Sequence, residues 1–599
     1  MTTASHGLPA YKDSALPVDR RVEDLLSRMT LEEKAGQLFH SMLMMNPDGT
    51  PVTETDGSIL PFTTPELIEG RFLTHFNLLG SYGAREMAMW QNAVQEMAAA
   101  TRLGIPVTLS TDPRHSFTDN VGASFNAGAF SAWPEAIGLA AIGDPELVFA
   151  FADIMRREYL SVGFRVALHP QIDLATEPRW ARQSGTFGSD AKLTGELVQA
   201  YVRGLQGEEL GAGSVSAMVK HFPGGGPQKD GEDPHFAHGK EQIYPGGLRE
   251  HHLEPFKAAI AAGCSQMMPY YGQPIGTDWE EVGFGFNKGV VTGLLREELG
   301  FQGIVCTDWG LLTDSTIFGE KHPARAWGLE HLSTAERTAR SLEAGSDQFG
   351  GEQCPEVIVE LVRSGRIPES RIDESVRRLL REKFVLGLFE NPYVDPDAAA
   401  ETVGRADFAA AGAAAQRRSL TVLTNTGGIL PVTSGPAASA SASARPKLYV
   451  KGVDEAVAAG YGDLVSDPAG ADLAVLRLRT PHEPRTNIFE SFFHSGSLAF
   501  PEPELTEILA LLDTVPTLVC INLERAAVIP EIAERAAALI ADYGASDAAL
   551  LDVAFGRAVA EGRLPFELPR SMEAVAASRP DVPNDTVDPV FPYGHGLRL

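Results

Sequence analysis

Short apolar runs alternate with amphipathic segments through the first two thirds of the chain. Five runs indicate buried strands, at residues 104–111, 162–172, 215–219, 264–268 and 304–306, and residues 344–347 mark the end of a sixth. Amphipathic stretches lie between several of these runs, at 145–162, 192–207, 253–263, 290–299 and 334–344. Strand followed by helix, repeated in series, predicts a parallel β-sheet covered by helices.

Polar side chains follow the predicted strands at the points where the strands end. They are Asp112, Arg114, His115, Asp173, Lys220, His221, Tyr270, Asp308 and Trp309. A (β/α) barrel gathers its strand ends on one active face, although an open, doubly wound sheet would also place polar groups there. The barrel is favoured because it takes roughly 250 residues plus insertions, and about 370 residues are available before the next domain.

A second α/β set follows a Pro- and Asp-rich stretch at 391–397. Strands are expected at 420–424, 448–451, 473–478, 518–521 and 538–541, and helices at 406–418, 503–512 and 547–560. The low-complexity stretch 436–444 is expected to be a surface loop. The predicted organisation is a barrel over 1–390, a linker over 391–415 and an α/β sandwich domain over 416–599.

Two helices are expected before the first strand. Residues 19–29 carry apolar side chains on one stripe, which predicts an amphipathic helix. Thr30 and Glu33 have the spacing of a capping box, so a second helix should run from residue 31 through Leu38.

Composition and net charge narrow the classes of partner and the location that can be expected. The 599 residues are 44% hydrophobic and 22% charged, and the net charge of −29 argues against nucleic acid or an anionic membrane as a partner. Residues 1–20 lack an apolar signal-like segment, and no stretch is long enough to span a bilayer, so a cytoplasmic location is expected. The four cysteines form no CxxC pair and are expected to be buried free thiols.

Asp308 is the lead catalytic candidate. It follows the apolar run 304–306 directly, and a carboxylate beside a core strand is costly unless it faces a polar cleft. A helix N-cap is the alternative explanation, because Asp is a good cap. The motif alone does not separate these two explanations.

The residues at the strand ends suit a sugar. Its hydroxyls need both donors and acceptors, and its C–H face stacks on an aromatic ring such as Trp309. A metal site is disfavoured, because Lys220 stands beside His221 and only His115 and scattered carboxylates could join it. A phosphate loop at 224–226 is disfavoured because Lys220 precedes the glycines. We therefore expect no metal and no cofactor.

Five stretches together resemble glycoside hydrolase family three along nearly the whole chain. They are 219–224 (VKHFPG), 178–188 (PRWARQSGTFG), 305–309 (VCTDW), 30–38 and 591–596 (FPYGHG). The resemblance implies a (β/α) barrel followed by an α/β sandwich with the pocket between them. It further implies a retaining, exo-acting glycosidase for β-linked sugars.

Matched residue by residue, the resemblance makes Asp308 the nucleophile. It assigns the binding of the terminal sugar to Asp112, Arg182, Lys220, His221, Tyr270 and Trp309. Arg179 should pair with a carboxylate in a structural role, and His115 could add a contact. The chain departs from the family pattern at 188–190, where Gly-Ser-Asp lacks one carboxylate. It also carries an insertion at 225–246, which we expect to cover the barrel mouth and narrow the substrate range.

Retention requires a second carboxyl group about 5–5.5 Å from the nucleophile, acting first as acid and then as base. In the resembled family this group comes from the second domain. The loop after the 473–478 strand offers Glu483 and Glu490. Glu483 is preferred because it lies nearer the strand end, where the family's acid usually lies.

The preferred function is a β-glucosidase, since Asp112, Lys220 and His221 together can hold a full set of equatorial hydroxyls. The alternatives are a β-xylosidase or other β-glycosidase, a β-N-acetylhexosaminidase and a non-catalytic sugar-binding protein. The hexosaminidases of the family carry a His where this chain has Gly225 and Gly226. Carbohydrate is the expected partner, and a homodimer is a reasonable expectation.

Overall fold

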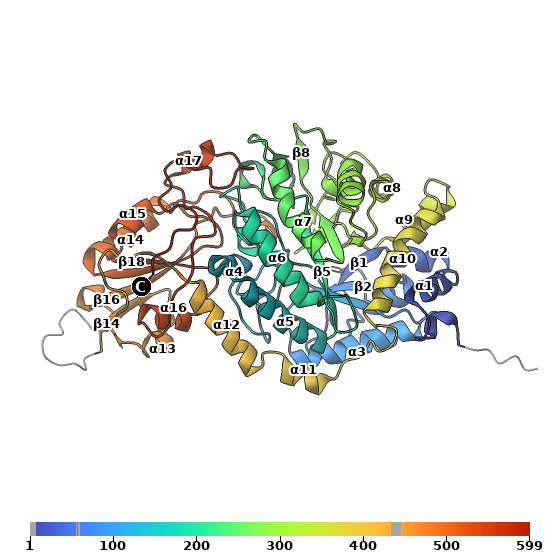
Figure 1. Ribbon diagram of the computed structural model, residues 1–599, viewed down its shortest axis with the longest axis horizontal. Coiled ribbons are helices and arrows are strands. Elements are labelled where there is room, and N and C mark those ends of the chain that lie inside the picture. Colours follow the sequence, from blue (N-terminus) through green and yellow to red (C-terminus); the bar gives the residue numbers. More distant parts are fainter. Residues whose placement is uncertain (1–7, 56, 58–59, 433–444, 599) are drawn as a thin grey trace, which may run out of the picture.

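The computed structural model describes residues 8–55, 57, 60–432 and 445–598. The stretch 436–444, expected to be a surface loop, lies outside these residues. Figure 1 shows two α/β domains, with the N-terminal one coloured blue to yellow and the C-terminal one orange to red. None of the helices in this described part of the chain combines the length and the apolarity needed to cross a bilayer.

The N-terminal domain is a closed parallel barrel. Its eight described strands are ordered β12-β1-β2-β3-β4-β5-β7-β9, and each pair of neighbours is parallel. A parallel bridge between Cys306 and Gln348 joins the two ends of this order. The strands are β1 (Phe39–Leu43), β2 (His75–Leu78), β3 (Thr108–Thr111), β4 (Phe164–Ala167), β5 (Ser216–Phe222), β7 (Gln266–Pro269), β9 (Ile304–Val305) and β12 (Phe349–Gly350). The predicted barrel is confirmed.

The sequence pattern missed two strands and misplaced a third. β1 and β2 carry His40 and Asn77 in the buried barrel interior, so neither strand has a continuous apolar run. Residues 344–347, expected to end a strand, instead finish the helix α8 (Thr334–Ala344) and form the turn after it. Gly345 ends that helix at φ +111°, and β12 begins four residues later.

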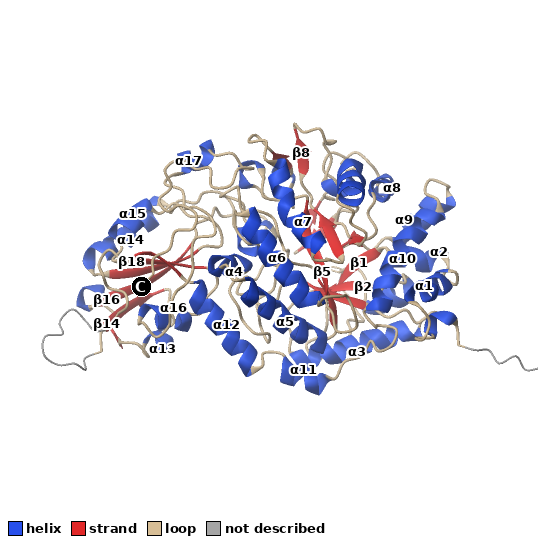
Figure 2. Cartoon of the chain, viewed as in Figure 1, coloured by secondary structure: helices blue, strands red, loops and turns tan. Residues whose placement is uncertain are grey.

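Helices surround the barrel strands (Figure 2). They are α3 (Ala84–Ala100), α5 (Pro145–Ser161), α6 (Ala191–Gln206), α7 (Glu254–Ala261), the π-helix Gly289–Glu298, α8, α9 (Pro355–Arg363) and α10 (Glu369–Val385). The N-terminal helices are α1 (Val18–Leu26) and α2 (Leu31–Gln37). The predicted capping box is present, with the Thr30 side chain accepting from the Glu33 amide and the Glu33 side chain accepting from the Thr30 amide.

Two helices connect the domains along one side of the barrel. α11 (Pro396–Thr402) packs against α3 and α5, and α12 (Ala406–Ser419) continues into the second domain (Figure 1). The stretch expected to be a linker, 391–415, therefore contains α11 and most of α12. The helix expected at 406–418 is confirmed.

The C-terminal domain is a six-stranded sheet in the order β13-β18-β17-β16-β14-β15, parallel except where β13 meets β18. The strands are β13 (Thr421–Thr424), β14 (Lys447–Lys451), β15 (Asp463–Leu464), β16 (Leu473–Arg479), β17 (Thr517–Asn522) and β18 (Ala538–Asp542). Helix α14 (Glu502–Thr514) packs against the core containing Val519 and Ile521. Helix α16 (Asp547–Ala554) packs against the core containing Leu518 and Cys520. Because alternate residues of one strand face opposite cores, the sheet is covered on both sides.

One buried side chain, Arg525, holds the loops of the second domain against the barrel. Its guanidinium donates to the carbonyls of Pro481 (2.6 Å), Ser495 (3.2 Å), Gly496 (3.0 Å) and Ser497 (3.1 Å) and, across the domain boundary, to that of Arg179 (2.8 Å). Burial lowers the pKa of Arg525 to about 10, so the group still carries its charge at neutral pH. The loop that carries Glu483 and Glu490 is therefore fixed in place by one cation.

Candidate active site

Asp308 lies three residues beyond β9, at the carboxyl edge of the barrel, and only 6% of it is exposed. Its Oδ1 accepts a hydrogen bond from the Trp309 amide (2.8 Å). Its Oδ2 is buried, forms no hydrogen bond with any described residue and lies 3.8 Å from His221 Nε2. No helix begins in the described residues between Asp308 and α8, so the helix N-cap explanation is wrong.

His221 is held as a neutral imidazole of defined tautomer. Arg182 Nη1 donates to His221 Nε2 (3.0 Å), so the ring proton lies on Nδ1 and is donated to Asp173 Oδ2 (2.7 Å). Burial, and then the neighbouring Arg182 charge, lower the pKa of His221 well below its ordinary value. Asp173 also accepts from the amides of His221 and Gly225, which fixes the backbone after β5.

Lys220 and Asp112 form a second charged pair in the same cluster. Lys220 Nζ donates to Asp112 Oδ1 (3.3 Å), and Asn77 Nδ2 donates to Asp112 Oδ2 (2.9 Å). Burial lowers the pKa of Lys220. The pair offers an ammonium donor and a carboxylate acceptor side by side, which is the combination that adjacent sugar hydroxyls require.

Aromatic rings line the same region. The Trp309 ring lies 5.4 Å from that of His40, and the Tyr270 ring lies 4.4 Å from that of His221. The Tyr271 hydroxyl faces Asp308, but its hydrogen bond goes to the Trp309 carbonyl (2.7 Å). The structure thus brings together all seven first-domain residues that the resemblance assigned: Asp112, Arg182, Lys220, His221, Tyr270, Asp308 and Trp309. Their individual roles stay predictions.

The insertion 225–246 contributes Asp233 to the wall of the site, a residue that the sequence did not single out. Asp233 is buried and accepts from the Tyr270 hydroxyl (3.3 Å) and from Trp180 Nε1 (3.2 Å), and its Oδ1 lies 2.6 Å from His235 Nδ1. Burial alone would raise the pKa of Asp233, but the neighbouring His235 and then Arg182 overcome this effect and lower it. In the sequence, the available signal for Asp233 was an acidic residue followed by Pro234 and His235 inside a long insertion.

The same insertion contacts the second domain. The His235 ring lies 4.7 Å from that of Phe493, and Arg485 Nη2 donates to Glu232 (2.7 Å). His238 Nε2 lies 3.2 Å from Glu490 Oε1. The insertion is therefore packed between the barrel and the loop that carries both acid candidates.

The two acid candidates have different surroundings. Glu490 is partly buried, and its Oε1 lies near two basic groups, His238 and Arg485 Nη1 (3.5 Å). Glu483 is exposed, and its Oε1 accepts a hydrogen bond from the Ser497 amide (3.3 Å). Its own amide donates to the Ser495 carbonyl (2.9 Å), close to the contacts of Arg525.

Three further expectations can be compared with the structure. Arg179 pairs with Glu177 (2.8 Å), as the structural role required. His115 is directed elsewhere than expected, because its Nε2 bonds the buried Glu158 (2.8 Å) and its ring packs against Phe130 and Tyr159. Ser189, where the family pattern has a carboxylate, donates to the Pro565 carbonyl (3.2 Å) and so contacts the second domain.

The fold and this site define a class of protein: a two-domain barrel enzyme whose polar residues cluster at the carboxyl edge of the strands. Comparison with known proteins names the family. Residues 30–382 match the N-terminal domain of glycosyl hydrolase family 3. The chain is 54% identical over 591 residues to a probable β-glucosidase C of Aspergillus flavus, covering 98% of this chain and 92% of that protein.

Two other comparisons agree. A periplasmic β-glucosidase/β-xylosidase of Dickeya chrysanthemi is 41% identical over 612 residues, covering 98% of this chain and 91% of that protein. The crystal structure of a Listeria innocua β-glucosidase in complex with glucose superposes with a TM-score of 0.75 at 22% identity, covering 97% of this chain and 83% of that one. The chain belongs to glycosyl hydrolase family 3 and is a glycoside hydrolase.

The surroundings of Asp233 predict a pH-dependent contribution to stability. Because its pKa is lowered in the folded protein, Asp233 stabilises the fold above its ordinary pKa of 3.8, and this contribution is lost as the pH falls through the folded pKa. Asp233→Asn should lower the free energy of unfolding by about 3 kcal/mol at pH 7. Urea unfolding of both proteins between pH 3 and 7 should show this difference shrinking below about pH 4.

Asp230→Asn is the matched control, because Asp230 lies in the same insertion with its side chain 68% exposed. Its effect should stay within about 0.5 kcal/mol at every pH. A difference between wild type and Asp233→Asn that did not change with pH would contradict the assignment of charge to Asp233.

Proposed function

We propose that this protein is a retaining, exo-acting β-glucosidase that releases terminal β-D-glucosyl residues through a covalent glycosyl–Asp308 intermediate. The observation that carries the proposal is the Oδ2 atom of Asp308, a buried carboxylate oxygen without a hydrogen bond in the described structure, set among donors and acceptors suited to a sugar. The names of the similar proteins from Aspergillus flavus and Dickeya chrysanthemi support the choice of a β-glucosidase.

In the first step, Asp308 Oδ2 attacks the anomeric carbon while the bond from that carbon to the leaving oxygen breaks. The leaving oxygen takes a proton from the acid, Glu483. In the second step, Glu483 removes a proton from water, the water oxygen bonds to the anomeric carbon, and the ester bond to Asp308 breaks. The sugar's configuration is retained because two inversions occur. The neutral His221 and the charged Arg182 hold the sugar and do not supply the proton.

Contacts favour Glu483 over Glu490 as the acid. Glu490 Oε1 lies 3.2 Å from His238 of the insertion and 3.5 Å from Arg485 Nη1, so this carboxylate is already engaged. Glu483 is exposed and lies nearer the end of β16. We therefore assign the acid/base role to Glu483, and we assign Glu490 to the contact with the insertion.

Packing around the Gly-Gly pair argues against a β-N-acetylhexosaminidase. A Cβ atom at Gly226 would lie 2.1 Å from the Leu174 carbonyl oxygen, and one at Gly225 would lie 2.7 Å from the Tyr270 ring. Both distances are too short for any side chain, so the catalytic His of those enzymes cannot replace either glycine here. The homodimer and the cytoplasmic location stay predictions.

Xylose is the second candidate sugar, because the protein from Dickeya chrysanthemi is named for both activities. A panel of p-nitrophenyl β-glycosides, followed by disaccharides, separates the candidates. We expect the highest kcat/KM for the glucoside. A xyloside value above the glucoside value would make the protein a β-xylosidase, and higher activity on the N-acetylglucosaminide would contradict both assignments.

Asp308 can be tested by trapping. A 2-deoxy-2-fluoro-β-glucosyl fluoride should inactivate the enzyme and add one sugar mass per chain, because the fluorine slows hydrolysis of the ester. Peptide mapping should place the label within 307–309. Asp308→Asn should lower kcat/KM by on the order of 10⁴-fold or more. A label on any other carboxylate would reject Asp308, and saturable glucose binding without turnover by the wild type would indicate a non-catalytic protein.

The assignment of Glu483 as the acid can be tested with substrates whose leaving groups differ in their need for a proton. Glu483→Ala should lose roughly 10³-fold in kcat/KM on cellobiose, whose leaving group needs a proton, and much less on a dinitrophenyl glucoside. Azide should restore turnover and yield β-glucosyl azide, since a small anion can attack without a general base. Glu490→Ala is the matched control and should show no azide rescue. The acid assignment moves to Glu490 if that variant shows the rescue pattern instead.

A further inference from the structure

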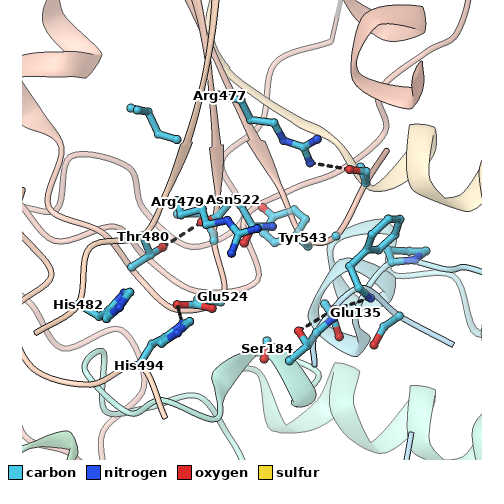
Figure 3. A pocket seen from close by; sticks show the side chains of 18 of the residues that line it. Glu135, Ser184, Arg477, Arg479, Thr480, His482, His494, Asn522, Glu524 and Tyr543 are labelled. Carbon is cyan, nitrogen blue, oxygen red and sulfur yellow. Dashed lines mark hydrogen bonds and ion pairs between the residues drawn. The ribbon is translucent and has the colours of Figure 1, made fainter. Parts of the chain in front are cut away.

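A large cavity lies between the two domains, apart from the Asp308 carboxylate. Its volume is about 1550 Å³; Arg182 and Lys220 line it, whereas Asp308 and Trp309 do not. One wall is formed by the residues at and beyond the carboxyl ends of β16 and β17. Figure 3 shows three side chains from this wall lying close together, His482, His494 and Glu524, with a dashed line between His494 and Glu524.

The three side chains form a compact group of potential metal ligands. His494 Nδ1 lies 2.7 Å from Glu524 Oε1. The rings of His482 and His494 are stacked with centroids 4.0 Å apart and planes 12° apart. One ligand atom from each of the three residues lies within 4.8 Å of the other two. Two imidazole nitrogens and one carboxylate oxygen, with a position left for water, are a ligand set typical of Zn²⁺.

The framework behind these ligands is rigid. Arg525 directly follows Glu524, and its buried guanidinium donates to the carbonyls of Pro481 and Ser495, the neighbours of His482 and His494 in the sequence. One side chain therefore fixes the three backbone segments that carry the ligands. A backbone that is already held in place lowers the entropy cost of binding an ion.

Small movements suffice to admit a cation. Bonds of about 2.0–2.1 Å from one ion to His494 and to Glu524 would widen their 2.7 Å separation by about 0.6 Å. His482 must also turn, because a ring nitrogen binds in the plane of its ring, and its exposed side chain has room to do so. The side chains of His494 and Glu524 are 30% and 23% exposed, so the ion can enter from solvent.

Glu524 pairs with His494 and, within the described residues, with no arginine or lysine, so its negative charge can be met by a cation. A second group of this kind, Glu232, His238 and Glu490, differs in one respect. There Arg485 pairs with both carboxylates, at 2.7 and 3.5 Å, and already supplies the positive charge.

We propose that His482, His494 and Glu524 form a binding site for one divalent transition-metal cation of the Zn²⁺ class. The three ligands are distinct from the residues grouped around Asp308. Because His482 directly precedes Glu483, the bound cation also restrains the loop that carries the proposed acid. Binding of the cation does not depend on which glutamate is the acid.

The test is metal titration of the untagged, full-length protein after treatment with a chelator. Zn²⁺ titrated by calorimetry at pH 7 should bind with one equivalent per chain at this site, and Co²⁺ should give the visible absorption bands of a tetrahedral site. His482→Ala and Glu524→Gln should each weaken Zn²⁺ binding at least about tenfold and remove the Co²⁺ bands. His238→Ala is the matched control from the second group and should bind as the wild type does.

Two results would overturn the proposal. One is a wild-type protein that binds no Zn²⁺ at micromolar concentration. The other is binding of Zn²⁺ by His482→Ala and Glu524→Gln with unchanged affinity and spectrum. Circular dichroism and thermal unfolding of each metal-free variant establish that it is folded. If Glu524→Gln does not fold, His482→Ala still tests the proposal, because His482 is more exposed than Glu524.

Discussion

The buried guanidinium of Arg525 is the interaction on which the arrangement of this enzyme depends. The mechanism proposed above requires an acid on one domain to lie against a sugar on the other. Arg525 supports that arrangement with hydrogen bonds to carbonyls of the loop that carries Glu483 and Glu490 and to the carbonyl of Arg179 in the barrel domain. A charged donor is stronger than a neutral one, and a guanidinium presents five N–H groups in a fixed plane. One side chain can therefore set the relative position of several backbone segments.

The barrel cluster follows a related principle, in which buried charges compensate one another. Asp112 faces Lys220, Asp173 faces His221, and Asp233 faces His235. Each buried carboxylate has a nitrogen donor beside it, so the desolvation cost of the acid is offset locally. Asp308 Oδ2 is the exception, since His221 Nε2 lies 3.8 Å away, the Tyr271 hydroxyl is directed to the Trp309 carbonyl, and Oδ2 forms no hydrogen bond within the described structure. That exception is what a nucleophile requires, because a carboxylate oxygen already engaged by donors is a poorer attacking group.

The insertion 225–246 contacts both the site in the barrel and the second domain. We expected it to cover the barrel mouth. The structure buries Asp233 of the insertion against Trp180 and Tyr270, and it places His235 next to Phe493 of the second domain. The insertion is thus part of the wall as well as a bridge between domains. Any change in its length would act on both the sugar cluster and the loop that carries Glu483 and Glu490.

Local pattern in the sequence determined the parts of this protein that depend on local physics. The barrel and the family could be identified from the buried runs before Asp112, Lys220 and Asp308, the Thr30–Glu33 capping box and the order of the motifs. The same motifs named most of the residues that the structure groups around Asp308. β1 and β2 were missed because barrel interiors tolerate His40 and Asn77 when neighbouring strands supply partners, and such partners are distant in sequence. The same holds for Arg525, Asp233 and the group of His482, His494 and Glu524. Their contacts join segments from different strands, loops or domains, so only the tertiary structure could decide which donor meets which acceptor.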